Sequence, residues 1–206
     1  VKVGFGDGDY LKNLLIENEI PFYNFKQLKR SANPFKNILF IFEFKKFLDK
    51  EKFDIVQLNS TNTLFGAIGA KLSKTKPKII FTFHGLSVLD SNYKNIFIRA
   101  IYWLFFKFSL LFVDKPVFVS KYNLEYAKKI KLLKNGAVIY NGIPQPNFIE
   151  KWEAQKFFES KTKINLNDKF ILGSIGRLDY QKNYEFLIQT FPDISKIKPD
   201  TILIII

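Results

Sequence analysis

The sequence predicts an α/β protein built on parallel sheets, in which helices join successive strands. Short apolar runs alternate with longer amphipathic stretches along the 206 residues, a pattern typical of doubly wound architectures with right-handed crossovers. Several short runs are apolar almost throughout, as expected for strands buried on both faces of a parallel sheet. Hydrophobic residues make up 47% of the chain, which is enough for a large core and excludes a disordered protein.

The predicted strands and helices cover most of the chain, with no short repeat and no low-complexity segment between them. Strands are expected at 1–5, 54–58, 78–83, 116–119, 137–140, 170–175 and 201–206. Helices are expected near 9–19, 35–50, 62–74, 93–112, 121–133, 150–160 and 182–196.

One segment predicts a domain boundary. Residues 141–149, NGIPQPNFI, combine Asn-Gly with two prolines, which break both helices and strands. The charge changes at the same place, because residues 1–146 carry 23 basic and 11 acidic side chains, whereas residues 147–206 carry 9 and 8. We therefore expect a first domain over 1–145, a linker with a connecting helix over 146–167, and the beginning of a second domain over 168–206.

Both ends of the chain fall inside predicted strands. Val1 already belongs to an apolar run, and the apolar strand at 201–206 is followed by no turn or helix that could cover it. An uncovered apolar strand favours aggregation. We therefore expect both domains to be incomplete, the first at its N-terminal side and the second at its C-terminal side.

The composition restricts both the chemistry and the partners. The chain has no cysteine, which excludes disulfides and thiolate metal sites, and its N-terminus lacks the basic start and apolar run of a signal peptide. The excess positive charge lies almost wholly in the first domain, which predicts an anionic partner there: phospholipid, nucleic acid or a phosphorylated substrate. A lysine-rich genome would also raise the total charge, but it explains the asymmetry less well.

The first candidate site residue is His84, the only histidine of the chain. The segment KIIFTFHG at 78–85 places it at the carboxyl end of a predicted strand, directly before a glycine. Ligands of open α/β sheets bind at this edge, so the residues alone support a functional and a structural role equally. Upstream, Gly4, Gly6 and Gly8 lack the G-x-G-x-x-G spacing of a dinucleotide site, and we interpret them as a flexible turn.

The strongest local signal is FILGSIGRLDYQKNYEFL at 170–187. A predicted strand runs into Gly176, which is followed by Arg177 and, near the start of a helix, by Lys182. Backbone N–H groups at a helix N-terminus attract phosphate, and arginine and lysine add charge and a bidentate fork. This arrangement predicts a pyrophosphate site, although the spacing alone leaves an ordinary exposed basic turn open.

The most hydrophobic stretch is NYKNIFIRAIYWLFFKFSLLFV at 92–113. A membrane span needs about 20 apolar residues without interior charge, and Arg99 and Lys107 interrupt this run. We therefore predict a core helix. Contact with a bilayer surface is the second interpretation, because aromatic and basic residues are mixed in the helix.

Taken in chain order, five segments resemble glycosyltransferase family 4, whose members have the GT-B fold. These segments are DIVQLNS, FTFHG, VFVSKYNLEYA, VIYNGIPQPNF and GSIGRLDYQKNYEFLI, and the resemblance runs from about Val1 to the last residue. Most specific is the combination of Asn-Gly-Ile after a strand with Gly-Arg-Leu-x3-Lys 35 residues later.

The resemblance implies two Rossmann-like domains, of which the N-terminal one binds the acceptor and the C-terminal one binds a nucleotide-sugar. Arg177 and Lys182, together with Gly176, would bind the donor diphosphate and stabilise charge on the leaving group. His84 would act as a catalytic residue on the acceptor side, near the transferred sugar. The family transfers sugar with retention and requires no metal or other cofactor.

The resemblance also implies a hinge at Asn141 and Gly142 and a role in surface polysaccharide or glycolipid synthesis. The acceptor would be a glycan or a lipid-linked sugar, the location cytoplasmic with contact to the anionic inner membrane face, and nucleic acid would not be a partner. The family's first strand would precede Val1 and its E-x7-E segment would follow Ile206. We therefore expect residues 1–206 alone to show no useful transferase activity.

Asn59 stands where many family members have histidine, which is a departure from the family pattern. An alternative hypothesis is a non-catalytic basic α/β module that binds membrane or nucleic acid. A third keeps the GT-B fold but acts on phosphorylated sugars, as phosphorylases do.

Overall fold

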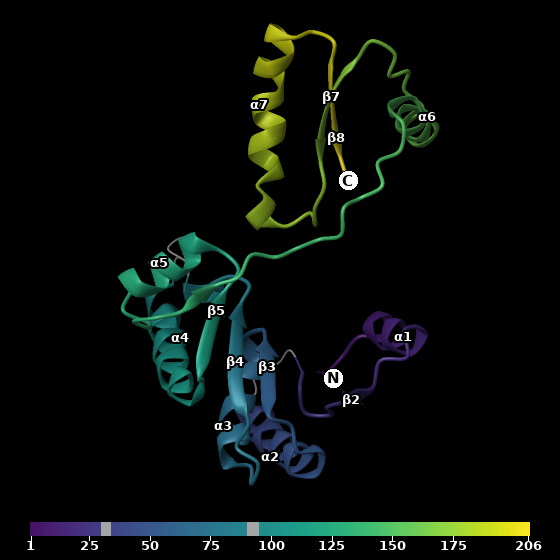
Figure 1. Ribbon diagram of the computed structural model, residues 1–206. Coiled ribbons are helices and arrows are strands. Elements are labelled where there is room, and N and C mark those ends of the chain that lie inside the picture. The colour runs from purple at the N-terminus through teal and green to yellow at the C-terminus, as the bar shows by residue number, and fades with distance from the viewer. Residues whose placement is uncertain (30–33, 90–94) are drawn as a thin grey trace. The chain divides into compact units, whose positions relative to one another are not determined.

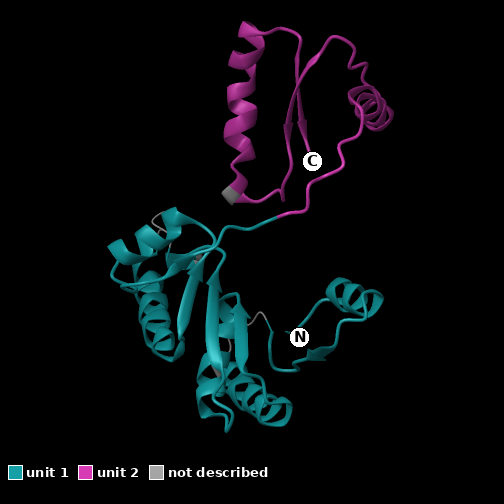
Figure 2. Cartoon of the chain, viewed as in Figure 1, with its two compact units in different colours: residues 1–142 teal, residues 143–206 magenta. Residues whose placement is uncertain are grey.

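A computed structural model of the protein describes residues 1–29, 34–89 and 95–206 (Figure 1). The chain forms two compact units, Val1–Gly142 and Ile143–Ile206 (Figure 2). The boundary directly follows the Asn141–Gly142 pair. Helix α6 (Lys151–Thr162) lies in the second unit.

The first unit is built on a four-stranded parallel sheet with the order β3-β4-β5-β6. Its strands are β3 (Ile55–Asn59), β4 (Lys78–Phe83), β5 (Lys115–Phe118) and β6 (Ala137–Val138). They are joined by α3 (Phe65–Leu72), α4 (Ile96–Ser109) and α5 (Lys121–Lys129). The predicted α/β fold with parallel sheets is confirmed. Positions 93 and 94 of the helix predicted at 93–112 lie outside the described residues.

A smaller parallel sheet pairs β1 (Val3–Phe5) with β2 (Phe22–Asn24), and α1 (Asp9–Glu17) joins the two strands. Phe25 attaches this sheet to α2 (Pro34–Glu51), because its buried ring lies 5.1–5.5 Å from the rings of Phe40, Phe44 and Phe47. The Glu43 carboxylate adds to this contact by accepting hydrogen bonds of 3.0 Å from the backbone N–H groups of Lys26 and Gln27.

The core of the first unit lies between the helices and one face of the four-stranded sheet. Val56 and Leu58 of β3 point into it, together with Ile79, Phe81 and Phe83 of β4. The alternate residues of β3 face outward, and Ile55 is 61% exposed. Strand β3 is therefore buried on one face only among the described residues, and its outward face carries the polar Gln57 and Asn59.

Asp114 joins three parts of the first unit just before β5. Its carboxylate accepts a hydrogen bond of 2.9 Å from the backbone N–H of Ile79, and it lies 3.1 Å from the ammonium of Lys71 and 3.7 Å from that of Lys78. Partial burial alone would raise the pKa of Asp114, but the Ile79 hydrogen bond and the two lysines hold this pKa below its ordinary value.

We expect Asp114→Asn to lower the free energy of unfolding by about 1–2 kcal/mol near neutral pH, because it removes charge-assisted hydrogen bonds. A lowered carboxyl pKa stabilises the fold above the unfolded-state pKa, and this stabilisation is lost as the pH falls through the folded-state pKa. The difference between the two proteins should therefore shrink below about pH 4. Urea unfolding over a pH series measures it, and a difference that persists in acid would contradict this role.

The second unit pairs β7 (Phe170–Ser174) with β8 (Thr201–Ile205) in parallel. The crossover between them contains a short 3-10 helix, η4 (Tyr180–Lys182), and α7 (Tyr184–Ile197). None of the helices in the described ranges of either unit combines the length and the apolar character that a bilayer crossing requires.

Candidate active site

In the first unit, the parallel register of β3 and β4 brings His84 to Asn59. Asn59 is the last residue of β3 and pairs with Thr82 of β4, two residues before His84. The His84 Nε2 atom lies 3.3 Å from the Asn59 Oδ1 atom. A carboxamide oxygen only accepts hydrogen bonds, so this contact favours the tautomer with a proton on Nε2 and leaves Nδ1 of the exposed imidazole as an acceptor.

Buried aromatic rings fix the end of β4 beneath His84. The ring of Phe83 stacks on that of Phe118 in β5, with centroids 4.5 Å apart and planes inclined by 6°. The backbone N–H of Val119 donates a hydrogen bond of 3.2 Å to the Phe83 carbonyl. His84 is therefore exposed directly after the end of β4, and the residue before it, Phe83, is buried.

A groove of about 610 Å³ lies beside this edge, between β1 and β3. Its lining is mainly apolar and includes Phe25, Phe40, Phe44 and Val56, with Asn59 also among the lining residues. His84 does not line it. Asn59 therefore borders both the groove and His84, whereas His84 itself lies outside the groove.

The predicted hinge residues follow β6 in an extended, exposed segment. The last described link to the sheet is a hydrogen bond of 2.9 Å from the Ile139 N–H to the Phe118 carbonyl. Asn141 and Gly142 are both exposed, and a Cβ atom placed on Gly142 would meet nothing within 4 Å. No steric contact among the described residues requires glycine at position 142.

In the second unit, Gly176 allows two side chains to lie close to the turn after β7. A Cβ atom at this position would lie 2.8 Å from the Tyr184 hydroxyl and 3.2 Å from the Lys182 Cε atom. The Gly176 N–H donates a hydrogen bond of 2.8 Å to the Ile206 carbonyl, which continues the pairing of β7 and β8. Two of the predicted site residues, Gly176 and Lys182, thus lie close together.

Arg177 begins a series of tight backbone turns that leads into α7. The Asp179 N–H donates to the Arg177 carbonyl at 2.8 Å, and the Lys182 N–H donates to the Asp179 carbonyl at 2.9 Å. Asn183 then adopts a left-handed conformation, with φ of 51°, immediately before the helix begins. Arg177 and Lys182 are both exposed, so one short turn presents a guanidinium and an ammonium to solvent.

Tyr184 is a candidate site residue that was not predicted from the sequence. It is the first residue of α7 and only 9% exposed, yet its hydroxyl has no hydrogen-bond partner in the described chain. A buried hydroxyl without a partner is costly, and this one lies where a side chain on Gly176 would otherwise stand. The sequence offered one signal, a tyrosine directly after the basic turn, but an aromatic residue at a helix start is usually a packing residue.

These groups together suit an anion with several oxygens. The N-terminus of the 14-residue helix α7 carries partial positive charge, and Arg177, Lys182 and the Tyr184 hydroxyl supply further donors. Among the residues described, no three His, Asp or Glu side chains lie close enough together to hold a metal ion.

The parallel sheets and the helices that join their strands define a Rossmann-like α/β protein. Residues 12–145 match the sequence profile of Glycosyltransferase Family 4, and the chain belongs to this family. It is 30% identical over 207 aligned residues to an uncharacterized glycosyltransferase of Methanocaldococcus jannaschii, covering 92% of this chain and 49% of that protein. The chain thus spans about half the length of the curated relative it matches.

Two solved structures show the same fold. A glycosyltransferase from Rickettsia africae superposes with a TM-score of 0.65 at 16% identity, covering 99% of this chain and 59% of that one. A putative UDP-N-acetylglucosamine 2-epimerase from Listeria monocytogenes superposes with a TM-score of 0.52 at 12% identity, covering 100% and 62%. At these identities the likeness concerns the fold alone.

Proposed function

We propose that the protein transfers a sugar, with retention, from a nucleotide-sugar to a glycan or lipid-linked acceptor in surface polysaccharide or glycolipid synthesis. The observation that carries this proposal is the turn from Gly176 to Tyr184 at the start of α7. It exposes Arg177 and Lys182, and beside Gly176 it holds the Tyr184 hydroxyl, which has no partner among the described residues. Membership of Glycosyltransferase Family 4 supplies the reaction class.

The proposed chemistry assigns the donor diphosphate to the second unit. Negative charge grows on the diphosphate as the bond between the anomeric carbon and the phosphate oxygen breaks. Arg177 binds this charge through a bidentate fork and Lys182 through a point charge. We propose that these two cations neutralise the diphosphate charge in place of a divalent ion, so that the chemistry requires no metal.

The proposed role of the first unit is to hold the acceptor side. His84 is exposed at a strand end, and its contact with Asn59 leaves Nδ1 able to accept a hydrogen bond from a sugar hydroxyl. Asn141 and Gly142, the last two residues of the first unit, are proposed as the hinge. Residues 1–206 are proposed to bind the donor diphosphate but to turn over little substrate by themselves.

Ligand binding by the 206-residue chain separates this proposal from the alternative of a basic module without catalysis. We expect a nucleoside diphosphate such as UDP or GDP to bind and inorganic pyrophosphate to compete for the same site. Equilibrium dialysis measures both, with duplex DNA as the second ligand. Salt-sensitive binding of DNA without any nucleotide binding would support the alternative module instead.

We expect Tyr184→Phe to weaken nucleoside diphosphate binding by about three- to tenfold, the size of one neutral hydrogen bond. The same change should leave the free energy of unfolding unchanged or slightly raised, because it removes a buried hydroxyl that has no partner among the described residues. Calorimetric titration and urea unfolding measure the two effects. Unchanged affinity together with lower stability would make Tyr184 a purely structural residue.

A further inference from the structure

The outer side of α4 carries a regularly spaced row of exposed apolar residues, the α4 seam. These residues follow one another at intervals of four, three, four and three positions, the repeat that is typical of a helix packed against a second helix. The opposite side of α4 carries the buried Phe106 and Ser109. The seam continues onto the 3-10 extension of the helix, η3 (Leu110–Phe112). Its residues, each 54–79% exposed, are Phe97, Ile101, Leu104, Phe108 and Leu111.

The length of the α4 seam distinguishes it from the other exposed apolar surface of the first unit, on α2. On α2 the exposed apolar residues extend only from Phe35 to Phe42, about two turns of helix, and the next exposed residue on that side is Lys46. The α4 seam extends from Phe97 to Leu111, about four turns, without a charged residue among its members. A sustained apolar repeat of this kind favours another helix as its partner.

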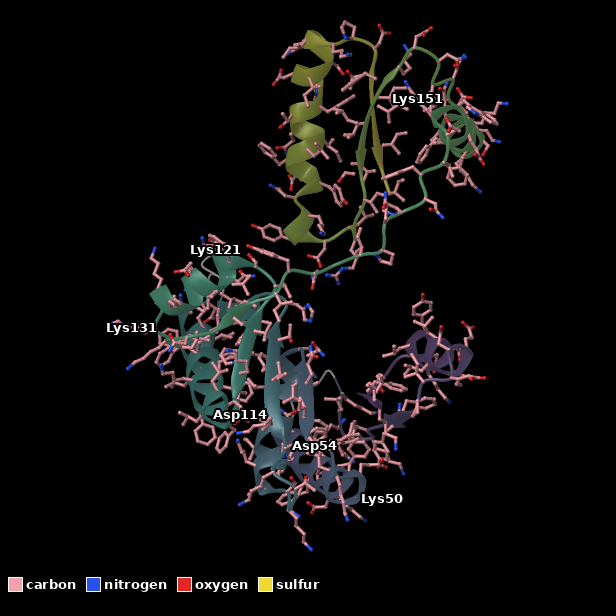
Figure 3. The ribbon with its side chains drawn as sticks, in the orientation of Figure 1. Lys50, Asp54, Asp114, Lys121, Lys131 and Lys151 are labelled. Carbon is pink, nitrogen blue, oxygen red and sulfur yellow. The ribbon has the colours of Figure 1, made fainter. Side chains whose placement is uncertain are left out.

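The two cations of α4 bind groups of α5 and of the turn that follows it. The Arg99 guanidinium donates a hydrogen bond of 3.3 Å to the Tyr126 hydroxyl. The Lys107 ammonium donates to the Lys131 carbonyl at 2.6 Å and to the Leu132 carbonyl at 3.2 Å, and Figure 3 labels Lys131. A helix that lies on a bilayer instead directs its cations toward the lipid headgroups. The charges of α4 therefore favour a protein partner for the seam over a lipid surface.

The area of the seam is close to what a stable pair of proteins requires. A large apolar side chain presents on the order of 150–200 Å² when it is fully exposed. With Ile96, which is 69% exposed at the start of α4, six residues offer roughly 600–800 Å² on each chain. A standard interface buries about 800 Å² of each partner. Single exposed apolar residues are normal, but a continuous surface of this size marks an interaction site.

We propose that the α4 seam pairs two copies of this chain about a two-fold axis. The apolar residues of one seam would pack into the spaces between those of the other, and a second copy supplies a matching repeat on the same helix. Leu104 is the middle residue of the seam, so it would meet its own counterpart whether the two helices run parallel or antiparallel. Pairing does not depend on the transfer reaction, so its failure would leave the proposed function intact.

The charge beside the seam predicts how pairing depends on salt. Residues 95–134 contain eight basic and only two acidic side chains, so both copies bring net positive charge to the contact. Because salt screens this repulsion, we expect pairing to become tighter between about 50 and 500 mM NaCl. Pairing that weakens over this range would contradict a contact made by the apolar seam.

Sedimentation equilibrium of the 206-residue chain tests the proposal. We expect a reversible equilibrium between monomer and dimer at micromolar concentrations, and dimerisation at least about 100-fold weaker for Phe97→Ser/Leu104→Ser. The matched control is Leu39→Ser/Phe42→Ser on α2, which removes the same residue types at positions 52% and 58% exposed. The control should dimerise as the wild type does, and circular dichroism checks that both variants remain folded.

A disulfide cross-link reports directly whether two α4 seams meet. Because the chain has no cysteine, a single introduced thiol can form a disulfide only between two copies. Leu104→Cys should form a covalent dimer under mild oxidation, since a disulfide requires Cα atoms within about 7 Å of each other. Leu39→Cys on α2 is the control and should stay monomeric.

Three results would overturn the pairing. They are a wild-type chain that stays monomeric at about 100 μM, an equal loss of dimer in the α2 control, and equal cross-linking at positions 39 and 104. A monomeric wild type that sediments with anionic lipid vesicles, and no longer does so as Phe97→Ser/Leu104→Ser, would assign the seam to a bilayer instead.

Discussion

Arg177→Ala is expected to weaken nucleoside diphosphate binding by about 10- to 100-fold, the effect of losing charge-assisted hydrogen bonds to a phosphate. The free energy of unfolding should change by less than about 0.5 kcal/mol, because the guanidinium is exposed on a surface turn. Calorimetric titration with UDP and GDP measures the affinity, and urea unfolding measures the stability.

The matched control for this prediction is Lys196→Ala, which removes a cation from the same unit. Lys196 is exposed near the end of α7 and pairs with Asp193 at 2.8 Å. Its loss changes the net charge by the same amount as the loss of Arg177, but at the opposite end of the helix. Equal weakening in both variants would show a general effect of charge and would speak against a specific site at Arg177.

Phe118→Ala is expected to lower the free energy of unfolding by about 3–5 kcal/mol. Phe118 is fully buried in β5, and its ring stacks on that of Phe83 with centroids 4.5 Å apart. Phe83 is the residue directly before His84. The substitution would leave a cavity against Phe83, whose ring also contacts Phe81 and Phe106 at 4.7 and 5.8 Å. The end of β4 should therefore loosen together with the core.

Chemical denaturation measures the stability of this variant, and hydrogen exchange measures the protection of the β4 amides. Phe42→Ala on α2 is the control, because this phenylalanine is exposed and its loss should change stability by less than about 0.5 kcal/mol. A loss below about 1 kcal/mol for Phe118→Ala would mean that the ring stack contributes little to the fold.

The α/β fold was predictable because most of its strands are marked by apolar residues. The runs leading into Phe83 and Phe118 were recognised in this way, and both strands lie in the parallel sheet. Strand β2 was not predicted, because only three residues, Phe22–Asn24, form it and no local pattern distinguishes so short a segment. Its position depends on the contact of Phe25 with α2, which is a tertiary interaction.

The part of the candidate site in which basic residues follow a glycine was predictable from the sequence. The part that depends on contacts between residues distant in the chain was not. Arg177 and Lys182 follow a strand and precede a helix, so their type and spacing predicted an anion site. Asn59 and Tyr184 were not in the predicted site, because their roles depend on neighbours 25 residues away across the sheet and on a buried hydroxyl beside Gly176. The spacing of residues in the sequence shows neither the register of paired strands nor which buried groups have hydrogen-bond partners.

Phosphorus NMR of UDP and GDP in the presence of the 206-residue chain tests the assignment of the donor diphosphate most directly. We expect both phosphorus resonances of at least one of these nucleotides to shift or broaden with the wild-type protein. With the Arg177→Ala/Lys182→Ala variant they should stay at their free positions. Unchanged resonances with the wild type, or the same perturbation with the double variant, would contradict a diphosphate site at this turn.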